Sequence, residues 1–355
     1  MKVAKILTGV ISILIIVSCS NHEISTASRV EIKQNANGQY RFFVNDEPFY
    51  VKGAGLEFGD ISLLAAHGGN SFRTWRTENG KKSAKEILDE AHANGLMVLM
   101  GIDIGRERHG FDYDDPVWVK EQLEYVKNKV LKYKDHPALL AWGIGNELNL
   151  EAENMKVWNA VNDISKMIHD IDPYHPTTTM LAGINEKDID YMNVHCNDLD
   201  FISIQMYADI VNLQKRIEEA GYEGPYLVTE WGATGHWEVP RTEWDVAIEQ
   251  TSKNKAKAII DRYEKAVLAD PKYCMGSYVF LWGQKQERTP TWYGMFLESG
   301  NRTETVDAMH YLWNGNWPSN RCPTIDSVKL NGMDAYQNIK LEVGVKYQAR
   351  AWGRC

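Results

Sequence analysis

Short apolar runs alternate with longer amphipathic stretches over most of the chain. Eight runs of four to six residues are typical of buried parallel strands, and they cover residues 49–54, 71–75, 97–102, 139–144, 177–181, 201–206, 226–229 and 277–281. Between them, residues 83–94, 116–134, 152–170, 211–220, 243–269 and 303–313 show the charge-laced periodicity of surface helices. Eight strand–helix units predict an α/β protein of the (β/α)8 TIM barrel class, whose crossovers are right-handed.

The two flanks of this region alternate apolar and polar residues instead. Residues 29–33 and 40–44 alternate around the turn signal at residues 35–38 and predict an N-terminal β-hairpin. Residues 324–332 and 339–343 predict two or three strands of a β-sandwich of the Ig-like kind. The barrel domain is therefore expected over residues 29–316. The segment 317–355, fewer than 40 residues, cannot close a sandwich alone and either packs on the barrel or is truncated.

The first residues predict export. Lys2 and Lys5 precede an apolar stretch, residues 6–17, that is too short to span a bilayer comfortably, as in a secretory signal peptide over residues 1–18. The sequence Ile-Val-Ser-Cys at residues 16–19 resembles the bacterial lipobox, in which Cys19 is lipidated. The resemblance implies a tether over residues 19–28 and an anchor in a bacterial membrane, facing the periplasm or the cell surface. A plain cleaved signal peptide is the alternative.

Composition narrows the partners. The chain has 355 residues, 44% hydrophobic and 25% charged, which suffices for one large core and a small additional module. Its formal charge of −9 becomes −11 once Lys2 and Lys5 leave with the signal peptide, and no Lys/Arg block could neutralise phosphates, so nucleic acid is not an expected partner. The cysteines have neither disulfide nor zinc spacing, and no cofactor-binding or metal-binding motif is present.

Charged and aromatic residues gather where the predicted strands end. In a TIM barrel the carboxyl ends of the strands form the functional face. Glu147 follows the fourth strand and Glu230 follows the seventh, so the barrel predicts that the two carboxylates face each other across its mouth. Two such carboxylates, about 5 to 5.5 Å apart in retaining enzymes and about 6.5 to 9.5 Å apart in inverting ones, perform glycoside hydrolysis. The sequence therefore predicts a glycosidase.

Several motifs carry a family resemblance. The sequences Gly-Asn-Glu at residues 145–147 and Thr-Glu-Trp-Gly at residues 229–232 are similar to those of clan A retaining glycoside hydrolases, as are residues 70–75 and 136–142. Residues 45–53 resemble the start of the glycoside hydrolase family 2 catalytic barrel, and the likeness runs over residues 40–315. The amino-terminal jelly-roll and sandwich domains typical of family 2 are absent from this sequence. A lipoprotein barrel with a sandwich-like tail also resembles the endo-β-1,3-glucanases of family 158.

The resemblance implies roles for individual residues. Glu147 would be the general acid/base and Glu230 the nucleophile, with Asn146 on the sugar 2-hydroxyl. Arg73 and Tyr207 would hydrogen-bond Glu230, and Trp282 would form the floor under the sugar. A cation and a phenol at Glu230 lower its pKa, whereas Glu147 needs an environment that raises its pKa, because it must carry a proton at the start.

Further aromatic residues at the rim are candidates for contact with the glycan. Trp231, His236 and Trp237 follow the seventh strand, and Trp292 lies in the long loop after the eighth. Aromatic side chains at strand ends also fill cores, so this reading competes with a purely structural one.

The leading hypothesis is a retaining β-glycosidase that cleaves a β-glucan-type polysaccharide or oligosaccharide, with β-1,3-glucan favoured by the family 158 resemblance. A β-mannanase, a β-galactosidase-like hydrolase and a transglycosylase share every residue named above. A glycan-binding surface lipoprotein without activity is the alternative of a different class, although it would gain little from keeping both Glu147 and Glu230.

Overall fold

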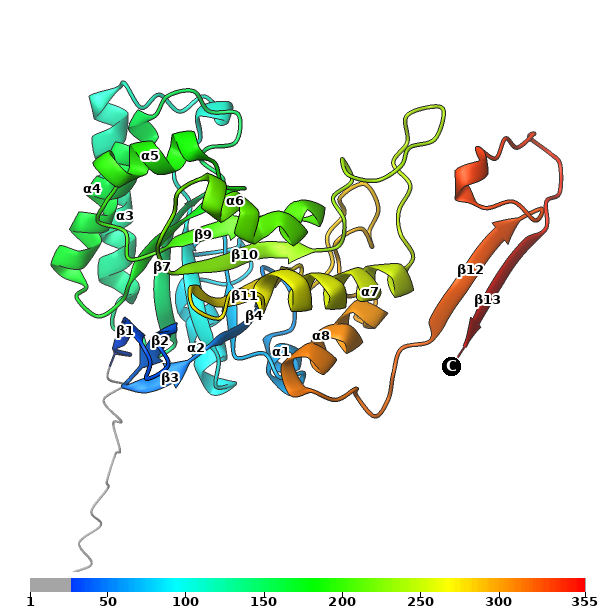
Figure 1. Cartoon of the computed structure of the whole chain (residues 1–355), viewed down its shortest axis with the longest axis horizontal. Helices are drawn as coiled ribbons and strands as arrows, with labels where there is room; N and C mark the ends of the chain where they lie inside the picture. The colour runs from blue at the N-terminus through cyan, green and yellow to red at the C-terminus, as the bar shows by residue number, and fades with distance from the viewer. Residues whose placement is uncertain (1–26, 355) are drawn as a thin grey trace, which may run out of the picture.

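A computed structural model describes residues 27–354 (Figure 1). The predicted signal peptide, Cys19 and most of the tether lie outside the described residues. Eight strands form a closed barrel in which every neighbouring pair is parallel. They are β4 (Val51–Gly55), β5 (Ser71–Arg73), β6 (Met97–Ile102), β7 (Leu139–Asn146), β8 (Thr177–Ala182), β9 (Ile202–Gln205), β10 (Tyr226–Gly232) and β11 (Cys274–Phe280). The predicted TIM barrel is confirmed.

Helices surround the barrel. They are α1 (Ile61–Ala66), α2 (Ala84–Ala93), α3 (Pro116–Tyr133), α4 (Lys156–Ile171), α5 (Glu186–His195), α6 (Leu213–Glu219), α7 (Ser252–Arg262) and α8 (Glu304–Asn314), with short turns at η1 (Glu107–His109), η2 (Ala208–Asn212) and η3 (Tyr263–Val267). Their starts follow local chemistry: Ser83 and Glu86 form a capping box on α2, and Asp115 caps α3 ahead of Pro116. Apolar side chains on their inner faces, such as Trp158 and Ile168 on α4, are fully buried against the strands.

One helix begins later than predicted. Residues 243–251 are not helical, because the Thr251 hydroxyl accepts from Asn254 N and starts α7 at Ser252. The residues before it form a long loop, which turns back on itself through a bridge between Arg241 and Ala247. This loop reaches the rim of the barrel that carries the candidate site.

The N-terminal hairpin closes the opposite end of the barrel. Strands β1 (Val30–Gln34), β2 (Tyr40–Val44) and β3 (Glu47–Phe49) form an antiparallel sheet, as expected for the hairpin, with one strand more. Phe42 is fully buried and meets Phe201, just before β9, edge to face at 5.4 Å. Since Val30 N and Tyr40 N bond to carbonyls ahead of β8 and β11, the sheet packs on the amino ends of the strands.

The C-terminal segment forms a small separate sheet (Figure 1). Strands β12 (Thr324–Leu330) and β13 (Ala349–Arg354) pair antiparallel, with the turn η4 (Ala335–Gln337) between them. The predicted strand over residues 339–343 is wrong: the stretch pairs with no strand, and Val343 is fully exposed. Sequence alternation alone does not make a strand without a partner edge. Within the described part of the chain, no helix has the length and apolar character needed to cross a bilayer.

Candidate active site

A cavity of about 1030 Å³ opens at the carboxyl ends of the barrel strands. Its walls come from five strands, β7 to β11, and from loops at the same end of the barrel, and they include Asn146, Glu147, Gln205, Tyr207, Glu230 and Phe280. Glu147 and Glu230, predicted from strand ends 83 residues apart, therefore line the same cavity. The arrangement agrees with the rule that TIM-barrel chemistry sits at this face.

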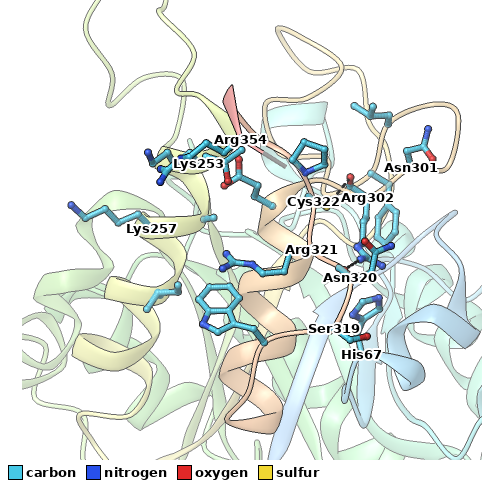
Figure 2. A pocket seen from close by; sticks show the side chains of 18 of the residues that line it. His67, Lys253, Lys257, Asn301, Arg302, Ser319, Asn320, Arg321, Cys322 and Arg354 are labelled. Atoms are coloured by element: carbon cyan, nitrogen blue, oxygen red, sulfur yellow. Dashed lines mark hydrogen bonds between the residues drawn. The ribbon is translucent and has the colours of Figure 1, made fainter. Parts of the chain in front are cut away.

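A larger cavity, of about 1620 Å³, lies between α7, α8 and the linker to the C-terminal sheet (Figure 2). Lys253, Lys257, Arg302, Arg321 and Arg354 surround it. None of the residues predicted for the site lines it, since they all cluster at the barrel mouth or in the core. Volume alone does not locate the chemistry in this protein.

Glu230 is held by three donors. Its carboxylate is nearly buried within β10; Tyr207 OH donates to Oε2 at 3.0 Å and Trp75 Nε1 donates to Oε1 at 2.7 Å. Arg73 Nη1 lies 3.4 Å from Oε1. Burial and the adjacent charge of Glu230 raise the pKa of Tyr207 well above its usual value, so this phenol remains a donor. These three groups fix the orientation of the carboxylate.

Arg73 connects the two halves of the site. It extends from β5, is fully buried and donates from Nη2 to Asn146 Oδ1 at 2.7 Å. Its guanidinium also lies 4.6 Å from the centre of the Trp75 ring, where a cation is favourably placed. Burial lowers its pKa, while the carboxylates of Glu230 and Glu147 oppose that shift. The predicted contact between Arg73 and Glu230 is present.

Glu147 has an unusual backbone. Its φ of 50° lies in the left-handed region, two residues after Gly145 at 73°, and such a conformation in a residue with a side chain costs on the order of 1–3 kcal/mol. Two contacts hold it: Glu147 N donates to Met180 O at 2.8 Å, and the Arg108 guanidinium donates to Glu147 O. The strain directs this side chain into the mouth of the barrel.

The environment of Glu147 favours its protonated form. Burial, followed by the negative charge of Glu230, raises its pKa to about 7, while Arg108, Arg73 and Arg106 pull in the other direction. Arg108 Nη2 lies 4.0 Å from Glu147 Oε2. Glu230 is thus surrounded by hydrogen-bond donors, whereas Glu147 retains a proton near neutral pH. Acid/base catalysis requires two carboxyl groups whose environments differ in this way.

Two residues of the site were not assigned roles from the sequence. Gln205, the last residue of β9, donates from Nε2 to Asn146 Oδ1 at 2.8 Å and lies 3.3 Å from Glu230 Oε1. With its amide turned over, the nitrogen instead faces Glu147 Oε1 at 2.8 Å, so this side chain can donate to one carboxylate or the other, depending on the orientation of the amide. Trp75, the other donor, follows β5 by two positions. Their places at strand ends are the signal that could have identified both.

The predicted sugar floor is corrected. Trp282 is among the residues around the cavity, but its side chain has no exposed surface: the indole donates to Asp60 O at 3.1 Å and the ring packs on Phe296 and Trp313, so the ring face is not available to a sugar. Phe280, at the end of β11, instead faces the cavity, with its ring 5.6 Å from that of Trp75.

The other predicted rim residues separate into core and surface. Trp231 is fully buried against Tyr263, so its assignment to substrate binding is wrong for a physical reason: its side chain faces the helix layer. Trp292 is 2% exposed and bonds to Thr234 O, so it anchors the loop after β10 rather than reaching the cavity. His236 packs edge to face on Trp292 and Trp237, outside the cavity wall. Of these four aromatic residues, Trp237 is the one that is exposed and lines the cavity.

In residues 27–354, no set of three or more His, Cys, Asp or Glu side chains is arranged to hold a metal ion. The donors of the mouth are guanidinium, phenol, indole and amide groups, which suit a carboxylate and the hydroxyls of a ligand.

Comparisons with known proteins agree with this geometry. Residues 53–283 match the model of glycosyl hydrolases family 2, TIM barrel domain. A β-glucuronidase from Sus scrofa is 24% identical over 233 residues, 58% of this chain and 34% of that protein. A probable mannan endo-1,4-β-mannosidase C from Aspergillus terreus is 31% identical over 122 residues, 30% of each chain.

Solved structures show the same fold. A β-D-glucuronidase from Dictyoglomus thermophilum has a TM-score of 0.62 at 18% identity, covering 82% of this chain and 54% of its own. A β-galacturonidase from Eisenbergiella tayi has a TM-score of 0.62 at 17% identity, covering 81% and 54%. The chain thus spans about a third of the length of the first of these curated relatives and about half that of these solved structures.

Proposed function

The chain belongs to glycosyl hydrolase family 2 through its TIM barrel domain, and from that premise we propose that it hydrolyses β-glycosidic bonds with retention of configuration. Glu230 is the nucleophile and Glu147 the general acid/base in this proposal. The contrast between the two carboxylates carries it: Glu230 accepts from Tyr207 and Trp75, whereas burial and the charge of Glu230 raise the pKa of Glu147 to about 7.

In the first step, a Glu230 oxygen attacks the anomeric carbon and the bond to the leaving oxygen breaks. Glu147 transfers its proton to that oxygen, so an alcohol leaves and a glycosyl ester remains on Glu230. Arg73, Tyr207 and Trp75 support this step because they fix the direction of the attacking carboxylate.

In the second step, water attacks the same carbon and releases Glu230. The charge of Glu230 is consumed in the ester, and that charge is one of the causes that raise the pKa of Glu147. Glu147, which lost its proton in the first step, accepts a proton from the attacking water. When the ester is cleaved, the charge of Glu230 returns and raises the pKa of Glu147 again, so Glu147 keeps that proton for the next turnover. Two inversions give net retention.

Small-anion rescue tests the assignment. Glu230→Ala and Glu147→Ala should both lose activity on an activated aryl β-glycoside, and sodium azide should restore turnover in each. Azide attacks the glycosyl ester in Glu147→Ala and gives a β-glycosyl azide, whereas in Glu230→Ala it replaces the nucleophile and gives an α-glycosyl azide. The two roles are refuted if the anomers are reversed or if either variant retains wild-type activity.

For the substrate, we propose a neutral β-linked sugar of the glucan type. The charged residues that line the cavity are acidic, except for Lys285: they are Glu57, Glu147, Asp209, Glu230, Glu238 and Glu287. Lys285 Nζ already lies 2.6 Å from Glu287 Oε2. Among the described residues, the lining thus offers a sugar carboxylate no cation without an acidic partner and presents further carboxyl groups instead, so it favours a neutral hexose over a uronic acid.

A panel of substrates tests that choice. Aryl β-glucoside, β-galactoside, β-mannoside, β-glucuronide and β-galacturonide should be compared with β-1,3-glucan and β-1,4-mannan. The proteins reported above are named for glucuronides, galacturonides and mannan, so β-1,3-glucan rests on the sequence resemblance alone. Preferential cleavage of either uronide would overturn the neutral-sugar proposal, while the azide results would still stand.

We also propose that the protein is exported and anchored through Cys19. The support is the sequence pattern of residues 1–19. Metabolic labelling with a clickable palmitate analogue should mark the wild type and not Cys19→Ala; equal labelling of both would refute the anchor.

A further inference from the structure

Trp237 differs from every other exposed tryptophan of the described residues. Five are more than a third exposed over residues 27–354: Trp118, Trp237, Trp244, Trp317 and Trp352. Of these, Trp237 lines the cavity that contains Glu147 and Glu230, and it is 55% exposed there. Trp317, by contrast, is stacked on Tyr311 and covered by the Arg321 guanidinium at 3.8 Å.

The indole of Trp237 lies next to Tyr207, the residue that hydrogen-bonds the proposed nucleophile. Its ring meets the Tyr207 ring edge to face, with centroids 5.4 Å apart and planes at 83°, and Tyr207 OH donates to Glu230. His236, its other aromatic neighbour, also stands nearly perpendicular, at 86°. Neither of these neighbours lies parallel on Trp237, so the indole keeps area available for a flat apolar surface.

The backbone around Trp237 is fixed rather than loose. The Glu238 carboxylate accepts from Gly235 N at 2.8 Å and from Ala208 N at 2.9 Å, and so joins the loop after β10 to the segment that carries Tyr207. Gly235 is required beside it, because a Cβ at that position would lie 2.6 Å from Trp237 Cε2. A side chain held in advance binds a ligand with less loss of conformational entropy.

We propose that Trp237 is a platform for a second sugar ring, one unit away from the ring that reacts at Glu230. This inference rests on the proposed glycosidase function and adds that the substrate is an oligosaccharide or polysaccharide rather than a single glycoside. The faces of pyranose rings carry C–H groups that pack on aromatic surfaces, whereas their edges carry the hydroxyls. A cavity of about 1030 Å³, at the upper end of ordinary ligand sites, has room for more than one such ring.

Chain-length dependence tests the platform. The wild type, Trp237→Ala and Trp237→Phe should be assayed on β-1,3-linked gluco-oligosaccharides of two to six units and on p-nitrophenyl β-D-glucoside, or on the matching series of the sugar that the panel identifies. Trp237→Ala should lose about tenfold more kcat/KM on the tetrasaccharide than on the aryl glycoside, mainly through KM. Trp237→Phe should recover part of that difference.

Two matched variants separate the platform from a general effect. Trp244→Ala removes an indole of similar exposure on the same loop, outside the cavity, and should leave the chain-length series unchanged. Gly235→Ala keeps the indole but displaces it, and should reproduce part of the Trp237→Ala loss. An equal loss on both substrates in Trp237→Ala would overturn the platform, because it would show that Trp237 acts only through Tyr207.

A binding measurement keeps this inference distinct from the proposed function. If the wild type hydrolyses nothing, the glycosidase proposal fails, and the hexasaccharide is then titrated calorimetrically into the wild type and Trp237→Ala. Binding that weakens about tenfold or more in Trp237→Ala supports the platform even so. No binding, or binding equal in both proteins, overturns it.

Discussion

The two large cavities of this protein differ in how the carboxylates at their walls are paired with other groups. In the larger one, the lining residues Arg302 and Cys322 are held by Asp307, which is buried behind the wall: its carboxylate lies 3.1 Å from Arg302 Nε and accepts from Cys322 N at 2.6 Å. At the barrel mouth, Glu230 is surrounded by donors but keeps an oxygen toward the cavity, and Glu147 is pushed toward its protonated form. Unequal carboxylates in one desolvated space, rather than cavity size, mark the reactive region.

The frameworks of the two regions explain that difference. The mouth is built on the ends of hydrogen-bonded strands, which hold side chains with little freedom and few local partners. The larger cavity is built from two helices and a linker, and its ionic groups hold those parts together. Charged residues therefore form the proposed active site at the mouth, whereas in the larger cavity they connect the helices to the C-terminal segment.

The largest expected effect comes from Glu230, the proposed nucleophile. Glu230→Gln should lower kcat/KM about 10⁴-fold or more, because the covalent step is removed while the shape is kept. Lys257→Gln, on the wall of the larger cavity, should keep full activity. Steady-state kinetics on aryl glycosides measures both, and comparable losses in the two variants would erase the distinction between the regions.

Glu147→Gln should show a loss that depends on the leaving group. The loss of kcat/KM should reach about 10²- to 10⁴-fold for a poor leaving group such as an alkyl alcohol, which needs the proton, and should be much smaller for 2,4-dinitrophenol, although kcat should fall for both because the second step still needs the base. Glu151→Gln, an exposed neighbour in the same loop, is the control and should be active on both. A uniform loss across leaving groups would contradict the assignment of Glu147 as the acid.

Tyr207→Phe should lower kcat about 10- to 100-fold, since it removes one charge-assisted hydrogen bond to Glu230. Tyr222→Phe, which removes a hydroxyl that donates to Pro225 O away from the mouth, should not. If Tyr207→Phe were as active as the wild type, Glu230 would need a different account of its orientation.

Asp307→Asn tests the other side of the comparison. It should decrease the free energy of unfolding by about 1–3 kcal/mol, because a buried ion pair with Arg302 is broken, and leave kcat/KM near the wild-type value. Chemical denaturation measures the first quantity. Asp261→Asn, whose partner Lys265 is exposed, should change stability by less than about 0.5 kcal/mol.

The smallest effect is a shift in pH dependence. Activity requires protonated Glu147 and is lost as pH rises through its pKa; the groups that face it are Glu230, Arg73, Arg106 and Arg108. Arg108 lowers that pKa, so Arg108→Gln should move the alkaline limb of kcat/KM to higher pH, and Arg108→Lys should move it less. An unchanged alkaline limb would show that Arg108 acts through the backbone of Glu147 alone, and a shift to lower pH would contradict its effect on the pKa.

The barrel, and the grouping of five candidate residues at its mouth, could be predicted from the sequence because both follow from the strand pattern. Apolar runs gave the eight strands, and the strand-end rule gave Glu147, Glu230, Asn146, Arg73 and Tyr207, all of which meet at the mouth. The period of two within a strand also separates Glu230, which faces inward, from Trp231, which faces the helices. Applied to the sequence, this alternation would have excluded Trp231 from the predicted site.

Other features depend on information that is not local. Trp282 lies just beyond β11, where strand periodicity stops and packing on α8 decides the direction of the side chain. The amphipathic pattern of residues 243–251 does not reveal that they turn back over the rim. Residues 339–343 have strand-like alternation, but β12 takes β13 as its partner. In each case tertiary contacts outweigh the local preference.

Side chains fill the barrel below the carboxylates, where Phe42 of the basal sheet joins the core, so within residues 27–354 the cavity that contains Glu147 and Glu230 opens at the mouth. In a double displacement, the departing alcohol must then leave by the passage through which the next reactant arrives. Water and a sugar hydroxyl both reach the glycosyl ester through that passage, so the ratio of hydrolysis to glycosyl transfer depends on which of them enters first. Concentrated substrate should shift that ratio toward longer products.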